Sequence, residues 1–234
     1  MHRKPICLCI LCLALYVSDV VGEPHPTSQS PPETALREVE LADPAMAATP
    51  EKRHQLHYLV TCALPKHIVL FTQQGAERFT FPGQMGLAPG WLTRPMTPQE
   101  ERWVSACMFA MVNYFGKHVE VSLRAEPPPV PFFQPSEEEK QRFPLFEGGF
   151  FGNLFGPHPV AYVCQGTRTP ADDQEPVFQD RVCTRATEEK TPDGKPLTPC
   201  QFILTGLCTD PTSFTVDGQH YQEVIFIYLQ ARVP

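Results

Sequence analysis

The chain has 234 residues, 27 of them proline, which is about twice the average share, and its formal net charge is -7 at pH 7. This length suits one domain with tails, and the 42% of hydrophobic residues is enough for a core, so a fully disordered chain is excluded. The acidic balance and the lack of a dense basic stripe argue against a nucleic-acid partner.

The N-terminus has the pattern of a secretory signal peptide. Arg3 and Lys4 precede an uncharged apolar stretch, residues 6–17, that is too short to cross a bilayer. The small-residue rule for signal cleavage predicts a cut after Gly22. The sequence therefore predicts a signal peptide over residues 1–22 and a secreted protein, periplasmic or extracellular, with no stable membrane span. Lipidation of a cysteine in this segment and an uncleaved anchor are the less favoured alternatives.

Residues 23–53 are rich in proline, serine, threonine, glutamate and alanine. Such a composition cannot bury enough apolar surface to offset the entropy of ordering it. We therefore expect a Pro-rich disordered spacer over 23–53, the alternative being an arm that lies on the domain. Residues 54–234 are then expected to form a single globular α+β domain.

The first elements of that domain are expected to be strands. Residues 56–64 and 67–73 are apolar runs broken at Pro65, and the second run is rich in β-branched and aromatic residues. Residues 77–81 alternate between apolar and polar side chains. Three strands are therefore predicted before the first loop rich in glycine and proline.

The strongest local signal predicts a helix over residues 98–115. Thr97 and Glu100 form a capping box, and Pro98 occupies the first helical position, where its missing N–H costs nothing. From Trp103 onward almost every side chain is apolar. A helix that is apolar on nearly all sides is buried, so we expect a central helix with strands packed around it.

Shorter elements follow in the second half of the chain. Ser136 and Glu139 form a second capping box, and the pair Asp217-Gly218 favours a type I′ hairpin turn. The remaining strands are expected at residues 118–124, 160–164, 201–204, 214–216 and 221–229. The predicted fold class is α+β: an antiparallel β-sheet packed around one central buried helix and stapled by disulfides.

Six cysteines remain after the predicted cleavage, and an even number in an exported chain indicates three disulfides. They are Cys62, Cys107, Cys164, Cys183, Cys200 and Cys208. Chain return is easiest across short turn-rich stretches, which favours a pair between Cys164 and Cys183. The same argument pairs Cys200 with Cys208 and leaves Cys62 for Cys107. A mixture of pairs and free thiols, or a metal site, is the alternative interpretation.

The segment 147–156 has the most unusual composition, because glycine and phenylalanine dominate it. As a loop it predicts a site for a glycan or peptide, with Phe150 and Phe151 as platforms and Glu147 and Asn153 as polar contacts. A second hypothesis makes Glu147 a general acid, which needs another carboxylate nearby. The structural alternative, which we favour, has the rings filling the core and Glu147 accepting hydrogen bonds from loop amides.

No metal and no cofactor are expected. His54 and His57 have a spacing that could serve a shared metal, but they border the predicted spacer, which favours solvated side chains. The chain lacks the short motifs typical of zinc proteases, nucleophile elbows and dinucleotide binding.

Four short stretches carry a family resemblance. They are W-V-S-A-C at residues 103–107, V-S-L-R at 121–124, E-G-G-F-F-G-N-L-F at 147–155 and A-Y-V-C at 161–164. With them the chain resembles a group of uncharacterised secreted bacterial proteins of unknown function, although Met111 and Gly149 depart from the pattern of that group. The resemblance implies export and a shared fold, and it implies no activity.

Two function classes remain. The favoured one is an exported, disulfide-stabilised, non-catalytic binding or cell-envelope module, whose ligand lies in the envelope or outside the cell. The alternative is a small extracellular hydrolase directed at glycans, with Glu147 as its general acid. A filled segment around Glu147 favours the module, whereas a cleft with a second carboxylate favours the enzyme.

Overall fold

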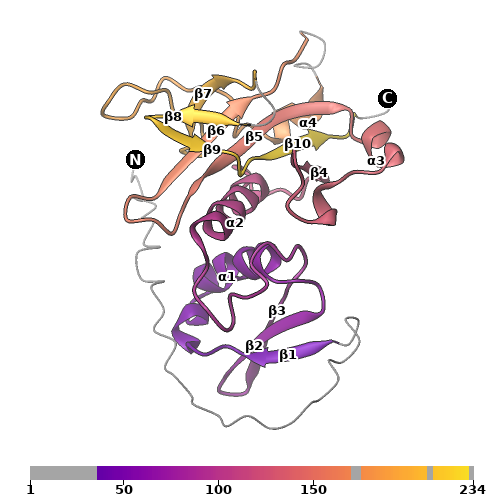
Figure 1. The fold of residues 1–234 in the computed structure, drawn as a ribbon, viewed down its shortest axis with the longest axis vertical. Coiled ribbons are helices and arrows are strands. Elements are labelled where there is room, and N and C mark those ends of the chain that lie inside the picture. Colours follow the sequence, from indigo (N-terminus) through magenta and orange to yellow (C-terminus); the bar gives the residue numbers. More distant parts are fainter. Residues whose placement is uncertain (1–35, 170–174, 210–212, 232–234) are drawn as a thin grey trace.

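The computed structural model describes residues 36–169, 175–209 and 213–231. Its two larger sheets lie at opposite ends of the long axis, and two helices lie between them (Figure 1). The predicted signal peptide, residues 1–22, falls outside the described residues, as does the first part of the predicted spacer.

The N-terminal part of the described chain is a three-stranded sheet with a helix packed on it. Its elements are β1 (Arg37–Glu40), the 3-10 helix η1 (Pro44–Ala47), α1 (Pro50–Ala63), β2 (Ile68–Gln74) and β3 (Glu77–Pro82). The first two strands pair in parallel, and β2 and β3 pair antiparallel. The strands predicted at 67–73 and 77–81 are therefore present.

Ordered structure begins earlier than the sequence predicted. The spacer expected over 23–53 already contains β1, η1 and the start of α1. Leu41 and Ala47 are buried in the core, and Val39 packs against it. These few apolar side chains pack the segment from β1 to the start of α1 against the domain. The average composition of residues 23–53 does not reveal them.

The strand predicted over residues 56–64 is instead the C-terminal half of α1. Thr49 caps this helix by accepting a hydrogen bond from the backbone N–H of Lys52. Leu56, Leu59 and Val60 are buried and recur at helical spacing. A short apolar run does not distinguish a strand from a buried helix, and here the burial of a helical face decides the conformation.

The helix predicted from the capping box is α2 (Pro98–Met111), and both hydrogen bonds of the box are present. The guanidinium of Arg94 donates two hydrogen bonds of 2.6 Å to the Glu100 carboxylate, and the backbone N–H of Thr97 donates a third of 2.7 Å. The Arg94 guanidinium is the main reason that the pKa of Glu100 is lowered to about 2.

Two helices share the centre of the molecule. One side of α2 packs against α1, and the other packs against the five-stranded sheet (Figure 1). The expectation of one central buried helix is therefore not confirmed, because α1 was assigned to a strand.

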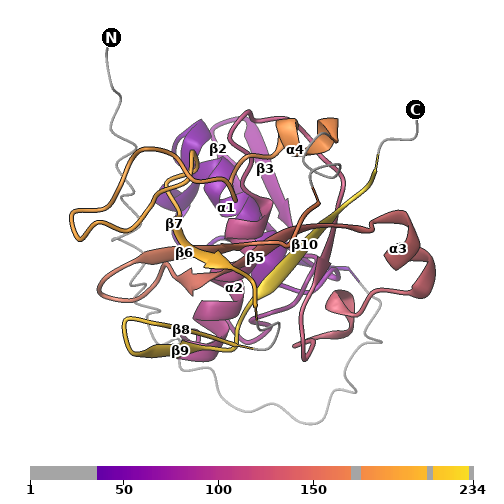
Figure 2. The ribbon, with the colours of Figure 1, turned by 90° about the horizontal axis from the view of Figure 1, so that it is seen from above.

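The larger sheet has the strand order β4-β10-β5-β6-β7, and only the pair β6–β7 is parallel. Seen from above, its strands cross over α1 and α2 (Figure 2). Its strands are β4 (Val121–Arg124), β5 (Leu145–Asn153), β6 (Val160–Gln165), β7 (Ile203–Leu207) and β10 (Ile225–Leu229). The connecting elements are η2 (Pro131–Phe133), α3 (Glu137–Arg142), α4 (Pro176–Asp180), β8 (Phe214–Val216) and β9 (Gln219–Tyr221).

Both faces of this sheet are covered by apolar side chains. The face toward α2 belongs to the main core. On the other face, the β8–β9 hairpin closes over a smaller cluster in which Phe214 stacks on Phe151 at 4.8 Å. Three disulfides cross-link the chain, so the α+β class and the disulfide stapling are as predicted.

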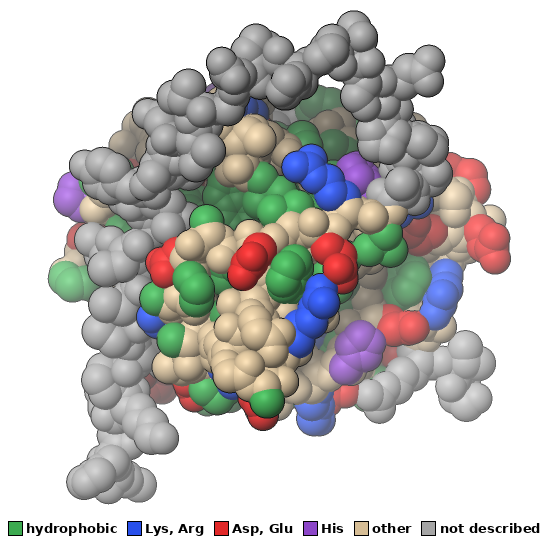
Figure 3. All heavy atoms as spheres, turned by 90° about the horizontal axis from the view of Figure 1, so that it is seen from below, with side chains coloured by type: hydrophobic (Ala, Val, Ile, Leu, Met, Phe, Trp, Pro, Cys, Tyr) green, Lys and Arg blue, Asp and Glu red, His purple; other side chains and the backbone are tan. Residues whose placement is uncertain are grey.

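The face at the end of the three-stranded sheet shows mixed chemistry. Figure 3 shows acidic, basic and apolar side chains interspersed there, without a large area of one charge sign. The ion pair between Arg78 and Glu38 joins β3 to β1 across the sheet.

Candidate functional site

The glycine-rich segment expected as a loop is the central strand β5. It pairs with β10 on one side and with β6 on the other. A Cβ at Gly148 would overlap the carbonyl oxygen of Cys164, and one at Gly152 would overlap that of Val160. The glycines therefore permit close packing within the sheet and do not form a flexible binding loop.

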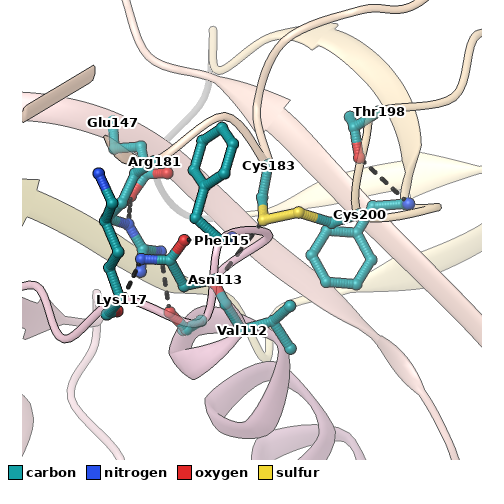
Figure 4. Close-up of a disulfide and its surroundings, with 11 residues drawn as sticks. Val112, Asn113, Phe115, Lys117, Glu147, Arg181, Cys183, Thr198 and Cys200 are labelled. Carbon is teal, nitrogen blue, oxygen red and sulfur yellow. Dashed lines mark hydrogen bonds and ion pairs between the residues drawn. A yellow bond between two sulfur atoms is a disulfide. The ribbon is translucent and has the colours of Figure 1, made fainter. Parts of the chain in front are cut away.

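Glu147 lies on β5 in a buried ion pair. Its side chain is 0% exposed, and that of its partner Arg181 is 3% exposed. The Nε of Arg181 donates to Oε2 of Glu147 at 2.6 Å, and Nη2 donates to the carbonyl of Ala110 in the last turn of α2 at 3.1 Å (Figure 4). Oε1 of Glu147 is buried and has no hydrogen-bond partner in the described part of the chain.

Burial controls the protonation of this carboxyl. Desolvation raises the pKa of Glu147, while the positive charges of Arg181 and Arg168 oppose the shift. A raised pKa in a cleft often indicates a general acid. Here the carboxyl is sealed from solvent and its nearest partner is a guanidinium, so the arrangement is that of a structural ion pair.

The other predicted contact residues are also enclosed. Phe150 and Phe151 are 0% exposed and point to opposite faces of the sheet. Asn153 is half-buried, and its side chain donates to Glu101 and accepts from the backbone N–H of Phe155. Glu147, Phe150 and Phe151 therefore present no exposed surface to a ligand, whereas Asn153 stays partly exposed and its binding role stays a prediction.

All six cysteines predicted for the mature chain are paired, but two of the three predicted pairs were wrong. Cys62 is bonded to Cys107 as expected, with Cα atoms 5.9 Å apart. The predicted pairs Cys164–Cys183 and Cys200–Cys208 do not occur. The disulfides are instead Cys164–Cys208 and Cys183–Cys200. Loop length misled the prediction. Cys164 lies near the C-terminal end of β6, and Cys208 directly follows β7, the parallel neighbour of β6, so the two cysteines are close in space.

The exposed aromatic loop, residues 112–118, is the feature that the sequence reasoning missed. The helix predicted to residue 115 ends at Met111, and the next residues turn outward. Tyr114 is 58% exposed and Phe115 is 49% exposed, with Val112 at 38%. Adjacent exposed apolar side chains of this kind are candidates for an interaction site.

Local hydrogen bonds fix the shape of the aromatic loop. The side chain of Asn113 accepts from the backbone N–H of Phe115 and donates to the carbonyl of Lys117. Gly116 donates its N–H to the carbonyl of Asn113 and has a φ of 63°, which favours glycine. The signal for this turn in the sequence is Asn followed three residues later by Gly, directly after an apolar helix.

The neighbouring segment 180–183 contacts the aromatic loop and the end of α2 (Figure 4). Asp180 at the end of α4 pairs with Lys117 at 2.6 Å. Arg181 holds the carbonyl of Ala110, and Sγ of Cys183 lies 3.7 Å from the carbonyl oxygen of Val112. The buried Glu147–Arg181 pair and the Cys183–Cys200 disulfide therefore anchor the base of the loop.

The described residues show no metal site. The described residues contain no group of three or more His, Cys, Asp or Glu that could hold a metal ion. His54 and His57 lie exposed on α1, and the pKa of His57 is lowered by partial burial and by its neighbour His54. Over the residues that the structure describes, no helix is long and apolar enough to cross a membrane.

Comparison with known proteins found no matching family model, no matching curated protein and no matching solved structure. The resemblance to secreted bacterial proteins therefore stays a prediction.

Proposed function

We propose that the chain is an exported, disulfide-stabilised module of the cell envelope or extracellular space that binds a ligand without catalysis. The observation that supports it most is the enclosure of Glu147. A general acid must reach the leaving group of its substrate, and this carboxyl is 0% exposed and held by Arg181. The segment around it is filled by Phe150 and Phe151, which is the arrangement expected of a module.

The disulfides support the proposal that the protein works outside the cytosol. Three disulfides persist in oxidising environments such as the periplasm or the extracellular medium and are rare in the cytosol. Export through the predicted signal peptide, residues 1–22, would bring the chain into such an environment.

The test combines maturation with a search for turnover. The full chain is expressed with its own N-terminus, recovered from the exported fraction, and measured by intact mass after alkylation without reductant. We expect a chain that begins at Glu23 and carries no alkylated thiol. We also expect no turnover on a panel of glycans and peptides. The proposal fails if the wild type shows turnover that Glu147→Gln abolishes while the melting temperature is retained.

A further inference from the structure

We propose that the aromatic loop, residues 112–118, inserts Tyr114 and Phe115 into the interfacial region of a lipid bilayer with electrically neutral headgroups. The inference rests on the proposed function, since it supplies the surface and the ligand class that a binding module needs. No other described segment places two large aromatic side chains in solvent next to each other.

Three polar backbone groups of the loop have partners within the loop itself. The backbone N–H groups of Phe115 and Gly116 and the carbonyl of Lys117 all bond to Asn113. Entry into a low-dielectric phase requires internal partners of this kind, because an unsatisfied backbone group costs several kcal/mol there. A loop built to bind a glycan would keep such groups available for the sugar hydroxyls.

The charges favour a neutral membrane over an anionic one. Residues 112–119 contain no acid, in a chain whose net charge is -7. The ammonium of Lys117 is paired with Asp180, so the loop carries little free charge. The rest of the molecule is repelled by an anionic surface, whereas tyrosine beside a basic residue is typical of the headgroup region.

The size of the exposed apolar surface separates a bilayer from a protein partner. Val112, Tyr114 and Phe115 together expose on the order of 300 Å². A stable protein interface takes about 800 Å² from each partner. The other exposed large apolar side chains, Leu36, Phe132 and Leu207, belong to separate segments. A small isolated protrusion suits insertion into lipid, which demands no complementary surface.

The experiment is flotation of the folded protein with vesicles of phosphatidylcholine and, separately, of phosphatidylglycerol. The test variant is Tyr114→Ser with Phe115→Ser, and the matched control is Phe132→Ser, which removes an aromatic that is 44% exposed on η2. We expect the wild type and the control to float with phosphatidylcholine and the double variant to lose at least ~10-fold in partition. Unchanged melting temperatures show that all three are folded.

A second readout reports on the side chain itself. Phe115→Trp should show quenching of tryptophan fluorescence by brominated phosphatidylcholine, whereas Phe132→Trp should not. The bilayer proposal is overturned if the wild type does not float, if the double variant floats equally, or if only anionic vesicles bind. A photo-crosslinker at position 115 that captures one protein in the envelope, with no flotation, would overturn the lipid ligand and leave the non-catalytic module standing.

Discussion

The Glu147–Arg181 ion pair offers the sharpest test of how this fold is held together. Glu147→Gln keeps the shape of the side chain and one oxygen for Arg181, but it removes the negative charge. The new amide group would occupy the position of Oε1, where no partner is present in the described part of the chain. The substitution therefore leaves a buried cation without its counter-charge and adds an unsatisfied donor.

The magnitude follows from the burial of both partners. Breaking a fully buried pair by removing one side costs about 3–5 kcal/mol, and a retained hydrogen bond offsets part of that cost. We expect Glu147→Gln to lower the free energy of unfolding by about 3 kcal/mol. For a chain of this length that corresponds to a decrease in melting temperature of about 6–12 °C.

The matched control removes both charges together. Glu147→Leu with Arg181→Met replaces the pair by apolar side chains, and such replacements are often close to neutral. We expect the double variant to lie within about 2 kcal/mol of the wild type, because the loss of the bond from Arg181 to Ala110 remains. The single variant Arg181→Met should be clearly worse than the double.

The assay is equilibrium unfolding in urea at pH 7.5 under non-reducing conditions. It is applied to Glu147→Gln and to the four members of the cycle, which are the wild type, Glu147→Leu, Arg181→Met and the double variant. A coupling energy of about 3 kcal/mol supports the structural role. A coupling energy near zero, or a Glu147→Gln variant as stable as the wild type, would falsify the reasoning.

Three further outcomes are expected. Glu100→Gln should lower the free energy of unfolding by about 1–1.5 kcal/mol at neutral pH, a value already reduced for solvent screening. The pKa of Glu100 is lowered to about 2 in the folded protein. The greater stability of the wild type should therefore persist above pH 4.5 and vanish as the pH falls toward 2, as measured by urea unfolding. Gly152→Ala should lower the melting temperature strongly, because the new Cβ would overlap a backbone carbonyl. Gly156→Ala should be tolerated, because its Cβ would lie 3.5 Å from the nearest atom. Equal decreases in melting temperature for the two variants would contradict the packing argument. Cys164→Ser with Cys208→Ser should cost about 4 kcal/mol, from closure of a loop of 44 residues, and non-reducing peptide mapping should recover this pair from the wild type.

Local signals in the sequence predicted the start of α2 correctly, although the helix ends four residues earlier than predicted. Thr97 and Glu100 define its start through bonds that involve only four consecutive residues, so no tertiary information was required. The same type of signal at Thr49 was hidden, because the prolines around it indicated a spacer. The start of α1 was missed for that reason, and its apolar C-terminal half was assigned to a strand, so the second helix at the centre was not predicted.

The nature of β5 could not be read from its own residues. Glycine and phenylalanine in succession are typical of loops, and the need for glycine at position 148 arises only from the carbonyl of Cys164 on the adjacent strand. The partner of Cys164 depends on the same neighbour relation, since β7 lies beside β6. Both facts belong to the topology of the sheet, which no local pattern encodes.

The exposure of the aromatic loop could not be predicted from hydropathy. Tyr114 and Phe115 continue the apolar run of α2 in the sequence, so hydropathy alone assigns them to the core. Asn113 and Gly116 end the helix early and turn these rings outward. Exposure of an apolar residue is therefore set here by a turn of four residues.

The position of β10 has a consequence for how the chain reaches its native state. This strand is the last in the described chain, yet it lies between β4 and β5 and pairs with both. In the larger sheet β4 therefore has no partner until residues 225–229 have emerged, whereas β5, β6 and β7 pair with one another without β10. Such long-range pairing slows folding, so we expect β4 and β10 to join the sheet after β5 and β6, whose pairing spans only a short stretch of chain.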